Sequence, residues 1–274
     1  MSSGRKIRFG RIMNYKDNRS VIIAMDHGLS DGVLEGIEQP SETIKRVIAG
    51  GADAMILNPG IIKQNSEIIS RNLGAIMRAD FIFTALSPSK KEGNDVIATV
   101  ERALRIGADA IIVNGFIGSE NERKSISYLS LLVDECDLWD MPIVAEMKPE
   151  GVDKPWDAKY VKVAARVASE LGVDLIKTYY TGDPKSFKEV IDSTPTPIVI
   201  LGGPRLDSLL KVFQMVSDAV SAGAAGIAFG RNIWHKRDPK PMVQAMVDII
   251  HNNIGSIHEW NAWNNSFDWR NTIR

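Results

Sequence analysis

The chain has 274 residues, and its 33 Lys and Arg nearly balance its 34 Asp and Glu, which gives a formal net charge of −1. This balance excludes the strongly basic surface of general nucleic-acid-binding proteins, so we expect no nucleic-acid partner. No stretch approaches the roughly 18 apolar residues of a membrane span, and the basic N-terminal segment lacks the apolar region of a signal peptide, so we expect no membrane partner either.

Eight short runs of β-branched and other apolar residues recur along the chain and predict strands. They are residues 21–25, 54–58, 81–85, 110–114, 142–147, 174–177, 197–201 and 226–230. Stretches with helical periodicity lie between most of these runs. They are residues 41–51, 94–108, 126–139, 157–173, 206–224 and 241–252. Strands and helices therefore alternate along the chain.

Four junctions between a helix and the next strand share one pattern, in which Gly follows the helix and a small or acidic residue precedes the strand. They read AGGADAMI, RIGADAII, ELGVDLIK and SAGAAGIA. Eight such units without a flexible linker predict one domain over residues 1–274, an α/β protein of the (β/α)8 TIM-barrel class with its core at about 20–253. An open doubly wound sheet would normally carry G-x-G-x-x-G after its first strand, where this chain has AMDHGLSDG.

Residues 254–274 lie beyond the eighth unit and form a Trp-rich C-terminal tail, which holds three of the six tryptophans together with Phe267. Aromatic side chains in such number must be covered. The tail either forms a helix that closes its own barrel or packs on a neighbouring subunit.

Polar residues stand at the predicted C-terminal ends of the strands, where barrels of this class carry their active sites. They are Asp26, His27, Asn58, Ser87, Asn114, Glu146, Lys148 and Lys177, followed by the segments GGPR (202–205) and GRN (230–232). We expect several of these side chains to meet over the barrel opening. The candidate substrate-binding residues are His27, Asn58, Asn114, Glu146 and Tyr179.

Lys177 ends the sixth strand, and the fifth strand carries Glu146 and Lys148 on one of its two sides. Because these strands are neighbours, both ammonium groups can face one cavity. A buried lysine near another cation loses proton affinity, and its neutral amine can attack a carbonyl to form a Schiff base. Lys177 is therefore the candidate nucleophile. Alternatively, Lys177 pairs with Asp26 or Glu146 and only holds the top of the barrel together.

Successive glycines end the last two strands, in PIVILGGPR and GIAFGRNIW, and leave backbone N–H groups open to an anion. The loops after strands seven and eight of such barrels often bind phosphate. The candidate phosphate-binding residues are Gly202, Gly203, Arg205, Gly230 and Arg231, and the arginines would add charge-assisted hydrogen bonds. Alternatively, these glycines only permit tight turns.

Asp26 and His27 form a pair at the end of the first strand. Because adjacent strand residues point to opposite sides, we expect only one of them to face the reacting centre. We favour Asp26, as a proton shuttle or as the partner that orients a lysine, and expect His27 to shape the site. Alternatively, Asp26 only accepts hydrogen bonds from nearby backbone N–H groups.

Metal and thiol chemistry find little support in the sequence. His235, His251 and His258 have no metal-ligand spacing with each other or with a nearby carboxylate, so we expect no metal site and no cofactor. Cys136 is the only cysteine, which excludes an intrachain disulfide and a cysteine cluster. A reducing compartment fits this composition, and we expect a cytoplasmic protein.

The segments AMDHG, LIKTYYTGD, PIVILGGP and GAAGIAFGRNIW, in this order, resemble the DhnA-type class I aldolases over roughly residues 8–253. The family includes archaeal-type fructose-bisphosphate aldolase, 2-amino-3,7-dideoxy-D-threo-hept-6-ulosonate synthase and the thiolase that acts on phosphorylated autoinducer-2. The resemblance implies a (β/α)8 barrel and a phosphorylated small-molecule substrate.

The same resemblance implies roles for single residues. Lys177 corresponds to the lysine that forms the Schiff base, Asp26 to the acid/base aspartate, and Gly202, Gly203, Gly230 and Arg231 to the phosphate-binding positions. Family members commonly assemble as large rings, often decamers. A homo-oligomer is therefore expected, and it would give the Trp-rich tail a role.

One departure concerns proton transfer. The aldolase and synthase members carry a tyrosine as proton donor at the end of strand five, whereas this chain reads EMKPEG and has Lys148 there. A lysine differs from a phenol in pKa and reach. The phospho-autoinducer-2 thiolase also lacks the tyrosine. The assignment of Lys148 as an acid/base residue rests only on its standing where the tyrosine would be.

Three functions remain open at this point. The first is a class I Schiff-base lyase on a phosphorylated ketose, like fructose-bisphosphate aldolase, with Lys177, Asp26 and Lys148 as catalytic residues. The second is a transaldolase-type or thiolase-type carbon–carbon transferase, with Lys148 as a base or as an anchor for a second anionic group. The third is a sugar-phosphate binder without turnover.

Overall fold

The structure is a computed structural model that describes residues 1–88, 94–203 and 208–252. Eight parallel strands close into a barrel, and the last strand pairs with the first, so the predicted (β/α)8 class is confirmed. Around the barrel the strands are β1 (Ser20–Ala24), β2 (Ala54–Leu57), β3 (Gly74–Arg78), β6 (Ala110–Ile117), β7 (Ile143–Pro149), β8 (Leu175–Thr178), β9 (Ile198–Leu201) and β10 (Gly226–Phe229).

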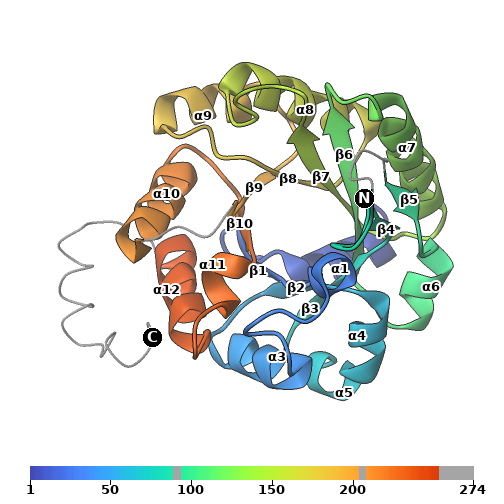
Figure 1. Ribbon diagram of the computed structural model, residues 1–274, viewed down its shortest axis with the longest axis vertical. Helices are drawn as coiled ribbons and strands as arrows, with labels where there is room; N and C mark the ends of the chain where they lie inside the picture. The colour runs from blue at the N-terminus through green and yellow to red at the C-terminus, as the bar shows by residue number, and fades with distance from the viewer. Residues whose placement is uncertain (89–93, 204–207, 253–274) are drawn as a thin grey trace.

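Helices form a ring outside the strands (Figure 1). They are α3 (Pro40–Ala49), α4 (Pro59–Gln64), α5 (Ser66–Ile69), α6 (Val100–Arg105), α7 (Glu122–Leu138), α8 (Ala158–Leu171), α9 (Pro184–Asp192), α10 (Leu209–Ser221) and α12 (Lys240–His251). The short helices α2 (Gly28–Asp31) and α11 (Arg231–Trp234) follow β1 and β10. Within the described ranges, none of the helices has the length and apolar character needed to cross a bilayer.

The sequence prediction missed α9, although its start carries a clear signal. The Asp183 side chain accepts hydrogen bonds from the backbone N–H groups of Lys185 at 2.9 Å and Ser186 at 3.1 Å, and Pro184 occupies the first helical position. Asp followed by Pro is a common way to begin a helix. This signal was available in the sequence.

Strand residues alternate between two apolar layers. One layer fills the barrel interior and includes Ile22, Ile76, Ile112, Val144 and Leu175, while their strand neighbours pack outward against the helices. This alternation follows from the two-residue period of a strand. It determines which residues of each strand face the barrel axis, and the same alternation extends to the residues at the C-terminal ends of the strands.

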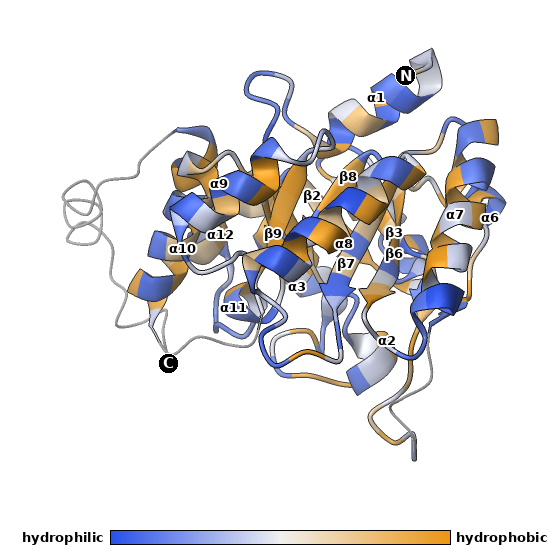
Figure 2. Ribbon diagram, turned by 90° about the horizontal axis from the view of Figure 1, so that it is seen from above, coloured by the Kyte–Doolittle hydropathy of each residue, from blue (hydrophilic) through white to orange (hydrophobic). Residues whose placement is uncertain are grey.

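An N-terminal helix that the sequence analysis did not predict, α1 (Ser3–Ile12), covers one end of the barrel, and α2 lies at the other end (Figure 2). Ile12 is fully buried and packs with the interior layer. Arg5 donates to Asp174 Oδ2 at 2.8 Å and also pairs with Asp137. The helix therefore closes the N-terminal opening, and only the C-terminal end is left for chemistry.

The third predicted strand was wrong. Residues 81–85 do not enter the barrel; instead β3 (Gly74–Arg78) pairs with both β2 and β6. Asp80 and Phe81 form a short strand, β4, antiparallel to β5 (Asp95–Val96). Residues 74–78 and 81–85 are both apolar runs that could fill this barrel position. Pairing with β2 and β6 selects the first run, and sequence periodicity carries no information about that pairing. The polar residue that ends the third strand is therefore Arg78, not Ser87.

Other boundaries also differ from the prediction. The helix expected over residues 94–108 begins only at Val100, because residues 95–96 form β5. The Trp-rich tail at 254–274 and the expected phosphate residue Arg205 lie outside the described residues.

His251 joins three segments at the N-terminal end of the barrel. Its Nδ1 lies 2.7 Å from Asp17 Oδ2 and its Nε2 lies 2.9 Å from Asp53 Oδ2. Burial alone would lower the pKa of His251, but Asp53 and Asp17 outweigh it and raise that pKa above its usual value. The protonated form therefore stabilises the fold. This stabilisation is fully present below the usual histidine pKa of about 6.5 and is lost as pH rises through the higher pKa of the folded state.

We expect His251→Gln to lower the free energy of unfolding by about 1 kcal/mol at pH 6, because a partly screened charged hydrogen bond is removed. The loss should be smaller at pH 9, because the fraction of protonated His251 falls as pH rises through its raised pKa. Urea unfolding of both proteins at the two pH values measures it. An equal loss at both values would contradict the ion-pair role.

Candidate active site

The strand alternation brings a set of charged side chains to the barrel axis above the apolar interior. Val144 and Leu175 belong to the interior layer, so Glu146 and Lys177, two positions further along each strand, face the axis as well. Glu146 and Lys177 are also paired in register across β7 and β8. The site is thus the polar continuation of the barrel's own core.

Glu146 is the carboxylate on which three cations converge. Its Oε2 lies 3.1 Å from Lys177 Nζ, its Oε1 lies 2.9 Å from Lys148 Nζ, and it also accepts a hydrogen bond from the guanidinium of Arg78. Burial alone would raise the pKa of Glu146, but Lys148, Lys177 and Arg78 together hold it well below its usual value. Glu146 is therefore a buried anion at neutral pH.

Lys177 is 5% exposed, which is rare for a lysine. Burial, together with the cations Arg78 and Lys148, lowers the pKa of Lys177 below its usual value, and Glu146 and Asp26 oppose this shift without reversing it. A lowered pKa increases the neutral amine fraction, which is the nucleophilic form. The ion pair with Glu146, which the alternative required, is present, and the role of Lys177 as nucleophile stays a prediction.

Arg78, which the sequence analysis did not single out, lies at the centre of the site. Its Nε donates to Asp26 Oδ2 at 2.7 Å, its Nη1 donates to Asp80 Oδ1 at 3.1 Å, and its Nη2 donates to Glu146. It is 6% exposed. The signal for it was the register of the third strand: once β3 is placed at 74–78, Arg78 falls on the same inward side as Ile76.

Asp80 connects Arg78 to the surrounding chain through its two carboxylate oxygens. Its Oδ2 accepts hydrogen bonds from Asn94 Nδ2 at 2.7 Å and from the backbone and side-chain nitrogens of Asn114, both at 2.9 Å. Asn114 in turn accepts a hydrogen bond from Lys148 Nζ at 2.9 Å. Asn114 therefore reaches the site as expected, and it joins Asp80 to Lys148.

Asp26 and His27 both reach the site, which differs from the expectation that only one would. The chain leaves β1 at Ala24, so strict alternation no longer applies at Asp26. Burial alone would raise the pKa of Asp26, but Arg78, with His27 and Lys177, lowers it. Burial lowers the pKa of His27, which keeps this ring neutral at pH 7.

Asn58 does not face the same space. Its Nδ2 donates to the backbone oxygen of Asp26 at 2.8 Å, so it fixes the chain that carries the carboxylate. The substrate-binding role predicted for Asn58 stays a prediction, and the structure shows a contact that supports the Asp26 backbone.

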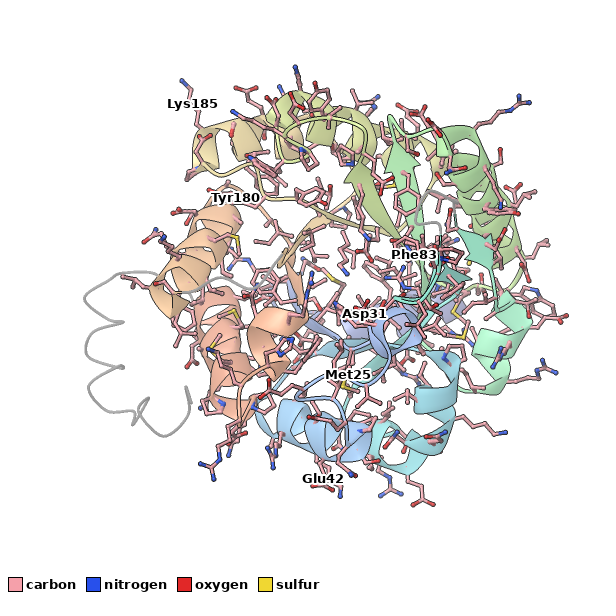
Figure 3. All side chains as sticks on the ribbon, viewed as in Figure 1. Met25, Asp31, Glu42, Phe83, Tyr180 and Lys185 are labelled. Carbon is pink, nitrogen blue, oxygen red and sulfur yellow. The ribbon has the colours of Figure 1, made fainter. Side chains whose placement is uncertain are left out.

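Two cavities open on either side of Lys177. The first, of about 340 Å³, is lined by Tyr179 and the glycine segments that follow β9 and β10; the second, of about 150 Å³, is lined by Asp26, Arg78, Asp80 and Asn114 and by the α2 region. Four residues border both cavities: His27, Glu146, Lys148 and Lys177. Figure 3 shows Asp31 of α2 over the ring of strands, whereas Glu42 and Lys185 lie at the outer edge. The amine therefore stands between two compartments.

The predicted phosphate residues Gly202, Gly203, Gly230 and Arg231 all border the larger cavity. Gly230 permits a close approach that a side chain would prevent, because an added Cβ would fall 2.6 Å from His27 Cε1 and 2.8 Å from the Ala24 oxygen. Gly203 has a positive φ of 61°, which favours glycine. Arg231 is exposed at the rim, where its cation could meet an anion. This half of the site can hold a small anion beside a reactive amine.

Comparisons with known proteins agree with this geometry. A model of the DeoC/LacD family aldolases matches residues 20–236. The chain is 32% identical over 252 residues to the 2-amino-4,5-dihydroxy-6-oxo-7-(phosphonooxy)heptanoate synthase of Streptomyces griseus, which covers 91% of each chain. It is 32% identical over 260 residues to the 3-hydroxy-5-phosphonooxypentane-2,4-dione thiolase of Klebsiella pneumoniae, over 95% of this chain and 85% of the relative.

Among solved structures, a Schiff-base-forming fructose-1,6-bisphosphate aldolase superposes with a TM-score of 0.82 at 27% identity. The alignment covers 90% of this chain and 99% of that one. The likeness therefore supports the class of Schiff-base-forming aldolases as well as the barrel fold.

Glu146 makes a testable contribution to Lys177. Because Glu146 raises the pKa of Lys177, Glu146→Gln should move the midpoint of Lys177 labelling to lower pH by about one unit, the usual effect of one close opposite charge. Competitive labelling with trace acetic anhydride, read by peptide mass spectrometry, measures this midpoint without any substrate. Glu150→Gln, further along the chain from β7, is the matched control and should leave it unchanged. A shift to higher pH in Glu146→Gln would contradict the assignment.

Proposed function

The chain belongs to the DeoC/LacD family of aldolases, and on that premise we propose that it makes or breaks a carbon–carbon bond in a phosphorylated ketose through a Schiff base on Lys177. The observation that carries the proposal is a buried lysine with a lowered pKa, 3.1 Å from Glu146, between two cavities. The enzyme is a class I aldolase by family, and the substrate and residue roles are the proposed part.

The substrate's ketone is proposed to carry phosphate on the carbon next to the carbonyl. The names of two similar proteins support this choice. The Streptomyces relative is named for a 6-oxo-7-phosphonooxy compound, and fructose 1,6-bisphosphate has the same adjacent pair at its keto end. The glycine rim and Arg231 would take the phosphate while the adjacent carbonyl carbon meets Lys177.

In the cleavage direction the neutral amine of Lys177 attacks the carbonyl carbon, and water leaves to give an iminium. A carboxylate removes the proton from the hydroxyl two carbons away, the carbon–carbon bond breaks, and an aldehyde departs while the electron pair forms an enamine. Protonation of the enamine carbon and hydrolysis of the iminium release the ketone and return the amine. The iminium carries the same charge as the ammonium it replaces, so Glu146 stabilises it electrostatically.

Asp26 and Glu146 are the proposed proton carriers, because both are buried anions beside Lys177. Lys148 is proposed to donate hydrogen bonds to the substrate from its position between the two cavities. His27 and Tyr179 border the larger cavity and would shape the keto end.

A second candidate is a transferase of the thiolase or transaldolase type, in which the enamine or acyl fragment passes to another acceptor. Lys148 at the position of the expected tyrosine favours it, as does similarity to the Klebsiella thiolase. In that reaction Lys148 would anchor a second anionic group.

The proposal extends to location and assembly. A buried, unpaired Cys136 supports a reducing, cytoplasmic environment. The family resemblance supports a homo-oligomer, with a decamer as the specific expectation.

Borohydride trapping tests the nucleophile. Wild type incubated with dihydroxyacetone phosphate and sodium borohydride should gain the mass of one reduced adduct, and Lys177→Met should gain none, because the proposed nucleophilic amine is gone. Lys148→Met, the matched control from the same cavity, should still form the adduct. Loss of the adduct in Lys148→Met but not in Lys177→Met would reverse the assignment. An untrapped wild type would point to another carbonyl or to a sugar-phosphate binder.

The phosphate rim has its own test. Arg231→Gln should weaken binding of dihydroxyacetone phosphate about tenfold, the effect of losing one charge-assisted contact worth about 1.4 kcal/mol. Unphosphorylated dihydroxyacetone should bind wild type and variant equally. Concentration dependence of trapping measures both, and an equal loss for the two ketones would show that Arg231 does not hold the phosphate.

A further inference from the structure

The guanidinium of Arg78 is the only group in the described site that contacts three carboxylates at once. One comes from the segment after β1 (Asp26), one from β4 (Asp80) and one from β7 (Glu146). These segments lie far apart in sequence. A planar group with donors in fixed directions therefore determines where their oxygen atoms stand relative to each other.

Two of these carboxylates, Glu146 and Asp26, raise the pKa of Lys177 through their negative charge. Glu146 contacts the ammonium at 3.1 Å, and Asp26 lies close enough to influence the pKa of Lys177. Proton transfer during carbon–carbon bond chemistry needs a base at a fixed position beside the iminium. The position of both candidate bases depends on one arginine.

We propose that Arg78 is a positioning residue, which holds Asp26 and Glu146 at fixed places near the reacting amine so that they can move protons. This inference rests on the proposed Schiff-base role of Lys177. Arg78 acts through the two carboxylates and does not touch the substrate.

A role as a phosphate ligand fits the geometry less well. Three of the N–H directions of Arg78 already end on carboxylate oxygens, and the side chain is 7% exposed. Asp80, which anchors Nη1, is itself held by Asn94 and Asn114. A substrate anion would have to displace a buried carboxylate, whereas Arg231 is exposed at the rim of the other cavity, where its Nη2 donates to the backbone oxygen of Gly203 at 3.5 Å.

The charged groups that face Arg78 from each neighbouring element are Asp26 after β1, Asp80 on β4, Glu146 and Lys148 on β7, and Lys177 on β8. Arg78 lowers the pKa of Asp26 and of Glu146 below the values that burial alone would give. It also lowers the pKa of Lys177. Replacing Arg78 should therefore move the carboxylate and amine titrations to higher pH.

Arg78→Lys and Arg78→Gln separate geometry from charge. Lysine keeps a cation but has no planar fork, so the hydrogen bonds that position the two carboxylates, one of which lowers the pKa of Glu146, are lost while the charge stays; glutamine removes the charge as well. The matched control is Arg5→Lys, because Arg5 is also a buried arginine that bridges two carboxylates, Asp137 and Asp174, at the opposite end of the barrel.

Two readouts with dihydroxyacetone phosphate distinguish nucleophile from base. Borohydride trapping reports attack by Lys177. Deuterium exchange at the hydroxymethyl carbon, followed by NMR in D₂O, reports the carboxylate that removes a proton from the iminium to give the enamine and then returns a deuteron.

We expect Arg78→Lys to trap the ketone with nearly unchanged concentration dependence, while its exchange rate falls about ten- to hundredfold, within the range for a displaced general base. Its acid limb should shift up by about one pH unit. In Arg78→Gln the pH limb of trapping should also shift up. Arg5→Lys should lower the melting temperature and leave both profiles unchanged. Unchanged exchange and an unchanged acid limb in Arg78→Lys would overturn the proposal, as would an equal effect in Arg5→Lys.

Two further measurements keep the test decisive. If Arg78→Lys does not fold, Asp80→Asn loosens the same fork, and the same shift in smaller degree is expected; an unchanged profile there contradicts the role. If wild type does not trap the ketone, the proposed function fails, and the pH midpoint of Lys177 labelling in Arg78→Gln decides the inference separately: a higher midpoint supports it, and an unchanged one overturns it.

Discussion

The structure of the site depends on keeping one lysine buried at the end of a barrel strand. Desolvation disfavours the charged amine, and an unpaired ammonium in this place would be costly. The chain compensates with alternating charges, in which Asp26, Asp80 and Glu146 meet Arg78, Lys148 and Lys177. Three negative and three positive groups leave the cluster neutral when Lys177 is protonated. The iminium has that same charge, so the cluster suits the intermediate as well as the resting enzyme.

Much of this could be predicted because a barrel converts sequence period into position. Alternation puts Glu146, Lys148 and Lys177 on the inward side, and neighbouring strands bring them together. The residues at the predicted strand ends therefore included all three. The glycine segments after β9 and β10 were found in the same way. These residues lie on regular strands or directly after them, where local pattern and final position agree.

The missed residues lie where local pattern does not determine pairing. Residues 74–78 and 81–85 are both short apolar runs, and only contacts with β2 and β6 select the first. Because the wrong run was chosen, Arg78 was not recognised as a strand-end residue, and its contacts with Asp26, Asp80 and Glu146 were not predicted. The contact of Asn58 with the Asp26 backbone, and the presence of both Asp26 and His27 at the site, were not predicted for a related reason. These residues follow a strand end, where the chain turns and the alternation no longer predicts direction. Helix α1 was missed because its packing on the barrel interior is a long-range contact that composition does not reveal.

Lys148 stands where the aldolase and synthase members of the resembling family carry a tyrosine, and its contacts show what a lysine provides there. Its nitrogen donates to Glu146 Oε1 and to Asn114 Oδ1, both at 2.9 Å, and an ammonium has three donors and no acceptor. In this arrangement Lys148 provides charge and hydrogen bonds, while a phenol would provide a neutral donor that can also accept. This difference is why Asp26 and Glu146, and not Lys148, are the proposed proton carriers. Neighbouring cations hold both carboxylates as anions, Asp26 chiefly through Arg78 and Glu146 through Lys148, Lys177 and Arg78. Arg78 at the end of β3 and Lys148 on β7 therefore act on the same pair of proposed proton carriers.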